Sequence, residues 1–253
     1  MNKIVAFDLD GTLAESKQAI THEVATILYS LSLKTKVIII SGGSYEQFTK
    51  QFVPGIVNAA KVKGNTRGLE NVILMPTNGS KRYEYDVDMH MWKETQMYPF
   101  NEEIKKKVML ELNSIIAGNF DVPRNHYGEY IEDRVTQITF SALGQTAPLE
   151  EKSIWDPTRS KRLKIKEVLE KAIPEIQAHV GGMTSIDILP KNFNKATGLL
   201  RYLSEEKLSI HDMLFIGDAI FEGGNDYSPL QAGIETKKTS GPKETVEIMQ
   251  TLL

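Results

Sequence analysis

Two aspartates near the start of the chain have the types and spacing for chemistry. The segment DLDGT sets Asp8 and Asp10 two positions apart, directly after the apolar run 3–7 and before Gly11. The run is short and β-branched, which predicts a buried strand of a parallel sheet. Ligands bind beyond the carboxyl ends of such strands, and residues i and i+2 of an extended segment point to the same side. Taken alone, DLDGT is better explained as a solvated Asp-Gly turn, so other segments must support a chemical role.

Three further segments place phosphate-binding groups at the ends of predicted elements. They are Ser41, Gly42 and Gly43 after the apolar run 37–40, Lys195 at the start of a predicted helix, and Asp218, Asn225 and Asp226 after the run 213–216. Backbone N–H groups of a glycine turn and a lysine bind phosphate oxygens, while carboxylates hold a divalent cation. Each segment also has an ordinary structural explanation. Their joint occurrence at successive strand ends favours a phosphate site.

The charges of this set call for a divalent cation. A phosphate dianion facing Asp8 and Asp218 would be repelled by about 4 kcal/mol per close pair at an effective dielectric of about 20. Lys195 alone does not offset that repulsion. Mg²⁺ prefers oxygen ligands, and a chain without cysteine offers no thiolate, so Mg²⁺ is the predicted cofactor.

The two aspartates of DLDGT then take different roles. A carboxylate held against phosphorus can attack in line, so Asp8 is predicted to be a nucleophile that forms an aspartyl phosphate. Asp10 lies further along on the same side. It is predicted to protonate the leaving oxygen and then to take a proton from the next acceptor.

The remaining sequence predicts the framework for these residues. Apolar runs alternate with amphipathic helices up to residue 81, and this pattern returns at residue 186, which indicates a parallel sheet with helices on both faces. The segment between them has the alternating runs and helices of an α+β module. We predict an α/β protein with a Rossmann-like parallel-sheet core, residues 1–81 and 186–253, and an inserted α+β cap domain, residues 82–185.

Composition excludes several other classes of protein. The 253 residues carry a net charge of −3 without a basic stripe, which argues against nucleic acid or an anionic membrane as a partner. No apolar stretch approaches the roughly 18 residues of a membrane span, and the apolar segment after Lys3 is too short for a signal peptide. A phosphorylated small molecule is the predicted partner, and the cytoplasm is the predicted location.

In this order, the four motifs resemble those of the haloacid dehalogenase superfamily of phosphatases and phosphomutases. Further details resemble its eukaryotic-type phosphomannomutase branch, which has a type IIB α+β cap. They are the GGS at 42–44, the GGND at 223–226, and the segment through which the chain returns from the cap to the core. That segment contains Gly181, Gly182, Ser185 and Asp187. The resemblance covers essentially the whole chain. It implies Mg²⁺, phosphohexose substrates and a homodimer formed through the cap.

The resemblance also implies which residues form the site. The implied catalytic residues are Asp8, Asp10 and Lys195. The implied phosphate and substrate contacts are Ser41, Gly42, Gly43, Arg134, Ser185, Asp187 and Asn225. The implied metal residues are Asp8, Asp10 through its main-chain carbonyl, Asp218 and Asp226. The cap residues Glu129, Thr139 and Ser141 are further candidates for contact with sugar hydroxyls, although alternation alone does not say which face they take.

The sequence departs from the mutases where a second phosphate would bind. Gln145 stands where the mutases carry an arginine, and another expected arginine falls at His126 or Tyr127, whereas Arg134 matches. Without a bidentate charged clamp, a sugar bisphosphate intermediate is held less firmly. A phosphosugar phosphatase is therefore the first prediction, and a hexose phosphomutase is the alternative. A receiver-type phospho-acceptor and a non-catalytic phosphosugar-binding protein remain as weaker rivals, and a P-loop kinase is disfavoured because GxxxxGK[ST] is missing.

Overall fold

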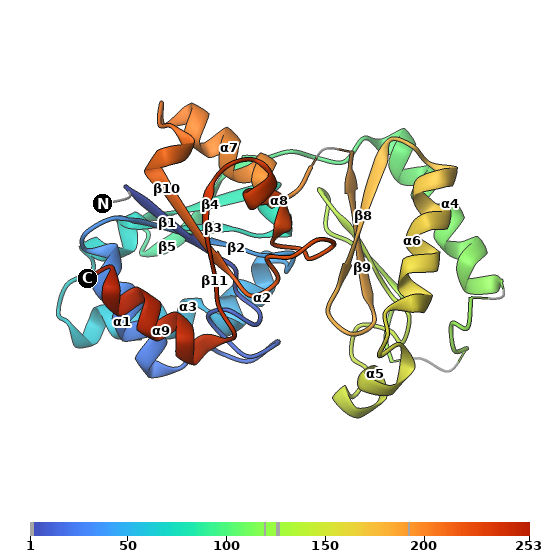
Figure 1. Cartoon of the computed structure of the whole chain (residues 1–253), viewed down its shortest axis with the longest axis horizontal. Coiled ribbons are helices and arrows are strands. Elements are labelled where there is room, and N and C mark those ends of the chain that lie inside the picture. Colours follow the sequence, from blue (N-terminus) through green and yellow to red (C-terminus); the bar gives the residue numbers. More distant parts are fainter. Residues whose placement is uncertain (1–2, 119, 125–126, 192) are drawn as a thin grey trace. The chain divides into compact units, whose positions relative to one another are not determined.

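The computed structural model describes residues 3–118, 120–124, 127–191 and 193–253. The chain divides into two compact units (Figure 1). The first, which we call the core unit, comprises Met1–Met97 and Asn194–Leu253, and the second, the cap unit, is Tyr98–Phe193. In the described part of the chain, no helix combines the length and the apolarity needed to cross a membrane.

The core unit is built on a seven-stranded sheet with the order β11-β10-β1-β2-β3-β4-β5. The first five of these strands run parallel, and β4 and β5 are added antiparallel at one edge. Their bounds are β1 Ile4–Phe7, β2 Lys36–Ile40, β3 Val72–Met75, β4 Lys81–Asp86, β5 Met91–Met97, β10 Met213–Gly217 and β11 Glu235–Lys238. Because β1 lies between β10 and β2, the residues that follow β1 and β10 meet at the carboxyl edge of the sheet.

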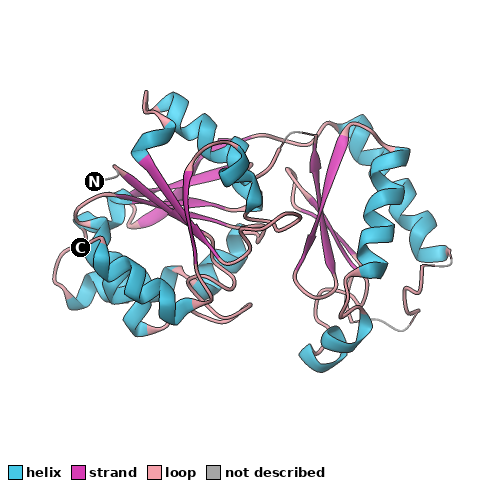
Figure 2. Ribbon diagram, in the orientation of Figure 1, coloured by secondary structure: helices cyan, strands magenta, loops and turns pink. Residues whose placement is uncertain are grey.

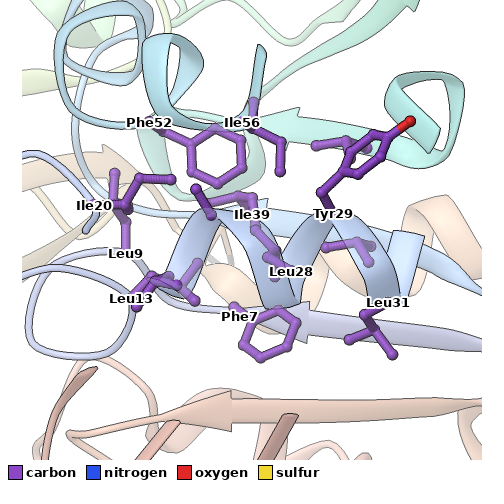
Figure 3. Packing of buried hydrophobic residues seen from close by; sticks show 14 of the residues in the cluster. Phe7, Leu9, Leu13, Ile20, Leu28, Tyr29, Leu31, Ile39, Phe52 and Ile56 are labelled. Carbon is purple, nitrogen blue, oxygen red and sulfur yellow. The ribbon is translucent and has the colours of Figure 1, made fainter. Parts of the chain in front are cut away.

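Helices cover both faces of the core sheet, so its central strands are apolar on both sides. The helices are α1 His22–Ser32, α2 Tyr45–Gln51, α3 Val53–Val62, α7 Lys195–Glu205, α8 Tyr227–Gln231 and α9 Pro242–Thr251. Phe7 and Ile39 pack on one face against Leu28 of α1 and Phe52 (Figure 3). Alternate residues of the same strands pack on the other face with α7. The continuous apolar runs in the sequence are the consequence of this double burial.

The cap unit is a four-stranded antiparallel sheet, ordered β6-β7-β9-β8, with helices packed on one face (Figure 2). Its strands are β6 Ile131–Asp133, β7 Ile138–Ser141, β8 Ile176–Gly181 and β9 Ser185–Pro190, and its helices are α4 Glu102–Ala117, α5 Leu149–Trp155 and α6 Ser160–Ala172. Ile138, Phe140, Ile186 and Ile188 are buried against the helices. The residues between them in β7 and β9 therefore face the opposite side of the sheet.

The predicted domain boundaries at 81/82 and 185/186 need correction. The hairpin of β4 and β5 was predicted in the cap, but it extends the core sheet. Tyr83 of β4 pairs with Leu74 of β3, and Trp92 of β5 belongs to the hydrophobic cluster that contains Phe7 and Ile39. Strand β9, predicted in the core, pairs with β7 and β8 of the cap sheet. Alternation in the sequence marks a strand with one polar face, but it does not say which sheet the strand joins.

Candidate active site

The carboxyl edge of the core sheet brings together residues from three distant parts of the sequence. Asp8 directly follows β1, and its N–H donates to the carbonyl of Ile216 in β10 at 3.0 Å. Asp218 follows β10 directly. Lys195 is the first residue of α7, and Asn194 caps that helix by accepting a hydrogen bond from the Thr197 N–H at 3.1 Å. The Asn194 hydrogen bond fixes where α7 begins, and it therefore fixes the position of the Lys195 backbone from which the lysine side chain extends.

Lys195 joins two aspartates inside the protein. Its Nζ donates to Oδ1 of Asp8 at 2.5 Å and to Oδ1 of Asp226 at 2.6 Å. The exposed fractions of the three residues are 1% for Lys195, 2% for Asp8 and 0% for Asp226. The second oxygen of Asp226 accepts the N–H of Ala219 at 3.1 Å, which holds the loop 218–226 against the end of β10. Lys195 is thus a buried bridging cation rather than a solvated lysine.

The buried charges are not balanced by this lysine alone. Burial raises the pKa of Asp8 well above its ordinary value, and the nearby carboxylates of Asp226 and Asp218 add to the effect against the opposing pull of Lys195. Burial and then Asp226 also raise the pKa of Asp218. The two carboxylates Asp226 and Asp8 raise the pKa of Lys195 despite its burial, so the ammonium stays charged. One cation therefore faces three carboxylates, and a further positive charge would stabilise the group.

The residues at this edge fit a divalent cation. Asp8, Asp218 and Asp226 each offer a carboxylate oxygen, and these oxygens lie within 4.8 Å of one another. Oδ2 of Asp8 is buried and has no hydrogen-bond partner in the part of the chain that the structure describes. Thr12 donates its hydroxyl to Oδ1 of Asp218 at 3.3 Å, so the neighbouring carboxylate is oriented by the DLDGT turn. An unpaired buried carboxylate oxygen among oxygen donors suits Mg²⁺, which prefers oxygen ligands.

The carboxylate of Asp10 is turned toward helix α2 and not into this acidic cluster. Its Oδ1 accepts the N–H of Lys17 at 2.7 Å and Nε2 of Gln51 at 3.1 Å, and its Oδ2 accepts Nε2 of Gln47 at 3.3 Å. The Asp10 carboxylate is therefore separate from the acidic cluster, and its main-chain contact with a metal stays a prediction. Sequence analysis missed Gln47 and Gln51, because glutamines on a helix are usually solvated.

The glycine turn after β2 is fixed by the turn after β3. Gly43 donates its N–H to the Ser41 hydroxyl at 3.2 Å, and the carbonyls of Ser41 and Gly43 accept the N–H groups of Asn78 at 2.8 Å and Thr77 at 2.9 Å. Ser44 caps α2 by accepting the N–H of Gln47 at 3.4 Å. The structure thus places Ser41, Gly42 and Gly43 at the same sheet edge as Asp8 and immediately before a helix start.

The turn after β3 supports the glycine turn and was not singled out from the sequence. Thr77 and Asn78 both have positive φ, at 51° and 56°, and both are buried. This conformation is uncommon for asparagine and strained for a β-branched threonine. Gly79 follows, and its Cα would lie 2.9 Å from a Cβ at Gly198 of α7. The turn therefore ties the glycine turn after β2 to the helix that carries Lys195. The dipeptide Asn-Gly was the available signal for it.

Asn225 is placed differently from its neighbours in the loop after β10. It is exposed, whereas Asp226 next to it is fully buried. Gly224 is required in this loop, because a Cβ there would lie 2.0 Å from the carbonyl oxygen of Ala219. Asn225 is therefore available to a ligand but has no described contact with the acidic cluster.

The cap sheet carries a polar row on the face opposite its helices. The register places Glu132, Thr139, Asp187 and His179 side by side across the four strands. The hydroxyl of Thr139 donates to Oδ1 of Asp187 at 2.8 Å, and the hydroxyls of Ser141 and Ser185 lie 3.1 Å apart. The structure thus groups Thr139, Ser141, Ser185 and Asp187, which alternation alone left undecided. Glu132 and His179 were not predicted.

The arginines expected of a second phosphate site are engaged or missing. Nη2 of Arg134 donates to Oε2 of Glu132 at 2.7 Å. Among the described residues Nε2 of Gln145 is buried and has no hydrogen-bond partner, while the Gln145 carbonyl accepts a hydrogen bond from Nζ of Lys152 at 3.5 Å. Tyr127 bonds Glu151, and His126 lies outside the described residues. Glu129 is exposed, and its carbonyl accepts the N–H of Gln145.

Comparison with known proteins agrees with this arrangement. The family model "Eukaryotic phosphomannomutase" matches residues 24–253. Phosphomannomutase 2 of Dictyostelium discoideum is 26% identical over 232 residues, which are 89% of this chain and 86% of that protein. The phosphomannomutase of Saccharomyces cerevisiae is 24% identical over 255 residues, 98% of this chain and 93% of that protein.

Solved structures share the fold. An N-terminally truncated IMP-nucleotidase of Plasmodium falciparum matches with a TM-score of 0.76 at 17% identity, over 100% of this chain and 70% of that chain. The same enzyme with bound IMP matches with a TM-score of 0.71 at 17% identity, over 99% and 68%. At this identity the match supports the α/β core with an inserted α+β cap and nothing finer. The chain belongs to the eukaryotic phosphomannomutase family, within the haloacid dehalogenase superfamily that its four motifs indicated.

Proposed function

We propose that this haloacid dehalogenase-type enzyme is a Mg²⁺-dependent phosphosugar phosphatase that works through an aspartyl phosphate. The observation that carries the proposal is the buried group of Asp8, Lys195 and Asp226 beside Asp218 at the carboxyl edge of the core sheet. A binding protein for phosphosugars would need the lysine and the glycine turn. It would not need the buried Asp8 carboxylate with its unpaired oxygen, nor the Asp10 carboxylate held apart from Asp8.

Each residue of the group has a task in the proposed reaction. A carboxylate oxygen of Asp8 attacks phosphorus, and the bond from phosphorus to the sugar oxygen breaks while the Asp10 carboxyl group gives that oxygen a proton. Water then attacks the aspartyl phosphate, Asp10 takes a proton from the water, and phosphate and the Asp8 carboxylate are released. Lys195 orients the carboxylate of Asp8 and neutralises charge on the phosphoryl oxygens.

The remaining residues bind. Bound Mg²⁺, held by carboxylates of Asp8 and Asp218 with Asp226 in support, would offset the negative charge of the transferring phosphoryl group. The turn of Ser41, Gly42 and Gly43, at the same sheet edge as Asp8, is the contact for phosphoryl oxygens in this proposal. The polar row of the cap sheet supplies hydroxyl and carboxylate groups for a sugar.

The cap unit supports hydrolysis over phosphoryl transfer between two positions of one sugar. A mutase retains a bisphosphorylated intermediate, and guanidinium groups suit that task because they bind phosphate through two hydrogen bonds. In this chain Gln145 replaces one such group, and the charge of Arg134 is engaged by Glu132. Hexose phosphomutase activity is the second candidate, favoured by the match to the phosphomannomutase family model.

The two candidates are separated by incubating the protein and Mg²⁺ with mannose and glucose phosphates, with and without a hexose 1,6-bisphosphate. Both released phosphate and interconversion of the 1- and 6-phosphates are followed. We expect release without interconversion, and no release by Asp8→Asn. Bisphosphate-dependent interconversion would establish the mutase and remove the significance given to Gln145. IMP belongs in the same assay, because the structural neighbour is an IMP-nucleotidase. The cytoplasmic location and the homodimer through the cap stay predictions from sequence.

A further inference from the structure

We propose that Gln51 and Gln47 of helix α2 are positioning residues that hold the carboxylate of Asp10 in the orientation needed for proton transfer. The proposal rests on the proposed function, in which Asp10 is the general acid and base. The motif DLDGT by itself places the Asp10 backbone. It does not say what directs the side chain, because a short carboxylate after a strand end has several rotamers available.

Gln51 is the stronger of the two contacts. Its side chain is 4% exposed, and its Nε2 donates one hydrogen bond to Oδ1 of Asp10 at 3.1 Å and one to the carbonyl of Gln18 at 3.1 Å. Both partners are acceptors, so the amide nitrogen must face them. The amide oxygen of Gln51 is left buried, and none of the described residues forms a hydrogen bond with it.

This unpaired oxygen indicates that packing alone does not explain a glutamine at position 51. A buried amide that leaves its oxygen unpaired costs free energy, and an apolar side chain of similar volume would pack at this position without that cost. The feature that an apolar residue would lose is the N–H donor to Asp10. A buried polar group with an unsatisfied atom calls for such an explanation.

Gln47 holds the other carboxylate oxygen. It precedes Gln51 by four residues, so both side chains project from the same face of α2. Its Nε2 donates to Oδ2 of Asp10 at 3.3 Å. Its Oε1 lies against the phosphate-binding turn, because a Cβ at Gly43 would stand 2.5 Å from that oxygen. Helix α2 thus contacts both the glycine turn, which is proposed to bind phosphate, and Asp10, which is proposed to transfer the proton.

The three donors fix the plane of the carboxylate. Oδ1 of Asp10 receives Gln51 and the N–H of Lys17, and Oδ2 receives Gln47. A rotation of the carboxylate about its last bond would break bonds to both oxygens. Orientation of a general acid matters for rate, because a general acid contributes about 10²–10⁴-fold and a misplacement of about 1 Å removes about 10²-fold.

The test compares two leaving groups in the full-length protein with Mg²⁺. A hexose 6-phosphate releases an alkoxide that needs a proton, whereas p-nitrophenyl phosphate releases a stable anion that does not. The variants are Gln51→Met and Gln47→Met, and the matched control is Gln250→Met at an exposed position of α9. Gln51→Met is expected to lower kcat/KM for the hexose phosphate by about 10–100-fold and kcat/KM for p-nitrophenyl phosphate by less than about 3-fold, because kcat/KM reports transfer of the phosphoryl group to Asp8 and not the later hydrolysis, in which Asp10 acts as base for both substrates.

An equal loss of kcat/KM with both substrates would show a merely structural role and overturn the proposal, as would no loss of kcat/KM with either. If Gln51→Met fails to fold, the two substrates are compared with Gln47→Met, because Gln47 is only half-buried. The expected loss of activity with the hexose phosphate is then smaller. A second readout is the combination with Asp10→Asn. Once the acid is gone, Gln51→Met is expected to have no further effect on the hexose phosphate. Failure of the proposed function is distinguishable, because the unaltered protein would then hydrolyse neither substrate or Asp8→Asn would keep full activity.

Discussion

Replacement of the buried lysine offers a direct test of the charge balance described for the site. Lys195→Met removes the ammonium and keeps a side chain of similar length. Its two attractions, at 2.5 and 2.6 Å, are each about 6–7 kcal/mol at an effective dielectric of about 20. Desolvation of the three ions cancels most of that gross energy. Removal of one partner from a buried ion pair typically costs about 3–5 kcal/mol, because the remaining charge is left uncompensated, and this is the expected loss in folding free energy.

The chain provides its own reporters for this experiment. It contains two tryptophans, and one is buried in each unit: Trp92 in β5 of the core unit and Trp155 in α5 of the cap unit. Urea unfolding in EDTA at pH 7.5 is followed by fluorescence in a Trp155→Phe background, which reports the core, and in a Trp92→Phe background, which reports the cap. Lys195→Met is expected to destabilise the transition reported by Trp92 and to leave the other unchanged.

A matched variant in the cap unit should show the converse. Arg162 is 2% exposed, pairs with Asp156 at 2.9 Å and also donates to the carbonyls of Gly181 and Gly182. Arg162→Met is expected to cost a similar ~3–5 kcal/mol in the transition reported by Trp155 alone. Lys195→Met with native stability in EDTA at pH 7.5 would refute the charge balance. A loss shared equally by both reporters would refute the independence of the two cores.

Three further outcomes follow from contacts in the two units. Gly198→Ala would place a Cβ 2.9 Å from the Cα of Gly79, so we expect it to destabilise the core by about 1–3 kcal/mol in urea unfolding and to lower kcat by displacing Lys195. Burial raises the pKa of Asp8 above its ordinary value of 3.8, so this carboxyl group binds its proton more tightly in the folded protein than in the unfolded chain. In EDTA the contribution of Asp8 to stability should therefore fall as pH rises from about 4 toward neutrality, and Mg²⁺ should restore more stability at pH 8 than at pH 5, as measured by thermal unfolding of the protein beside Asp8→Asn. Gln145→Arg should raise retention of a hexose bisphosphate, measured by direct binding, and unchanged affinity would show that this position does not face the second phosphate.

The sequence was sufficient for the parts of this protein that depend on local pattern. Continuous apolar runs marked the central strands, because a parallel sheet covered on both faces buries both sides of each strand. The motifs at the ends of those strands predicted the grouping of Asp8, Lys195, Asp218 and Asp226, since parallel strands end at one edge. Residue type and order alone thus identified the family and the acidic cluster that suits a metal.

Other features were decided only by tertiary structure. The hairpin of β4 and β5 and the strand β9 have the same alternating pattern, yet one pairs with the core sheet and the other with the cap sheet. The glutamines at 47 and 51 look like ordinary polar helix residues until the packing of α2 directs them to Asp10. A local pattern fixes the conformation and the polar face of a segment. Which strand it pairs with, and which side chain it meets, depend on contacts between residues far apart in the sequence.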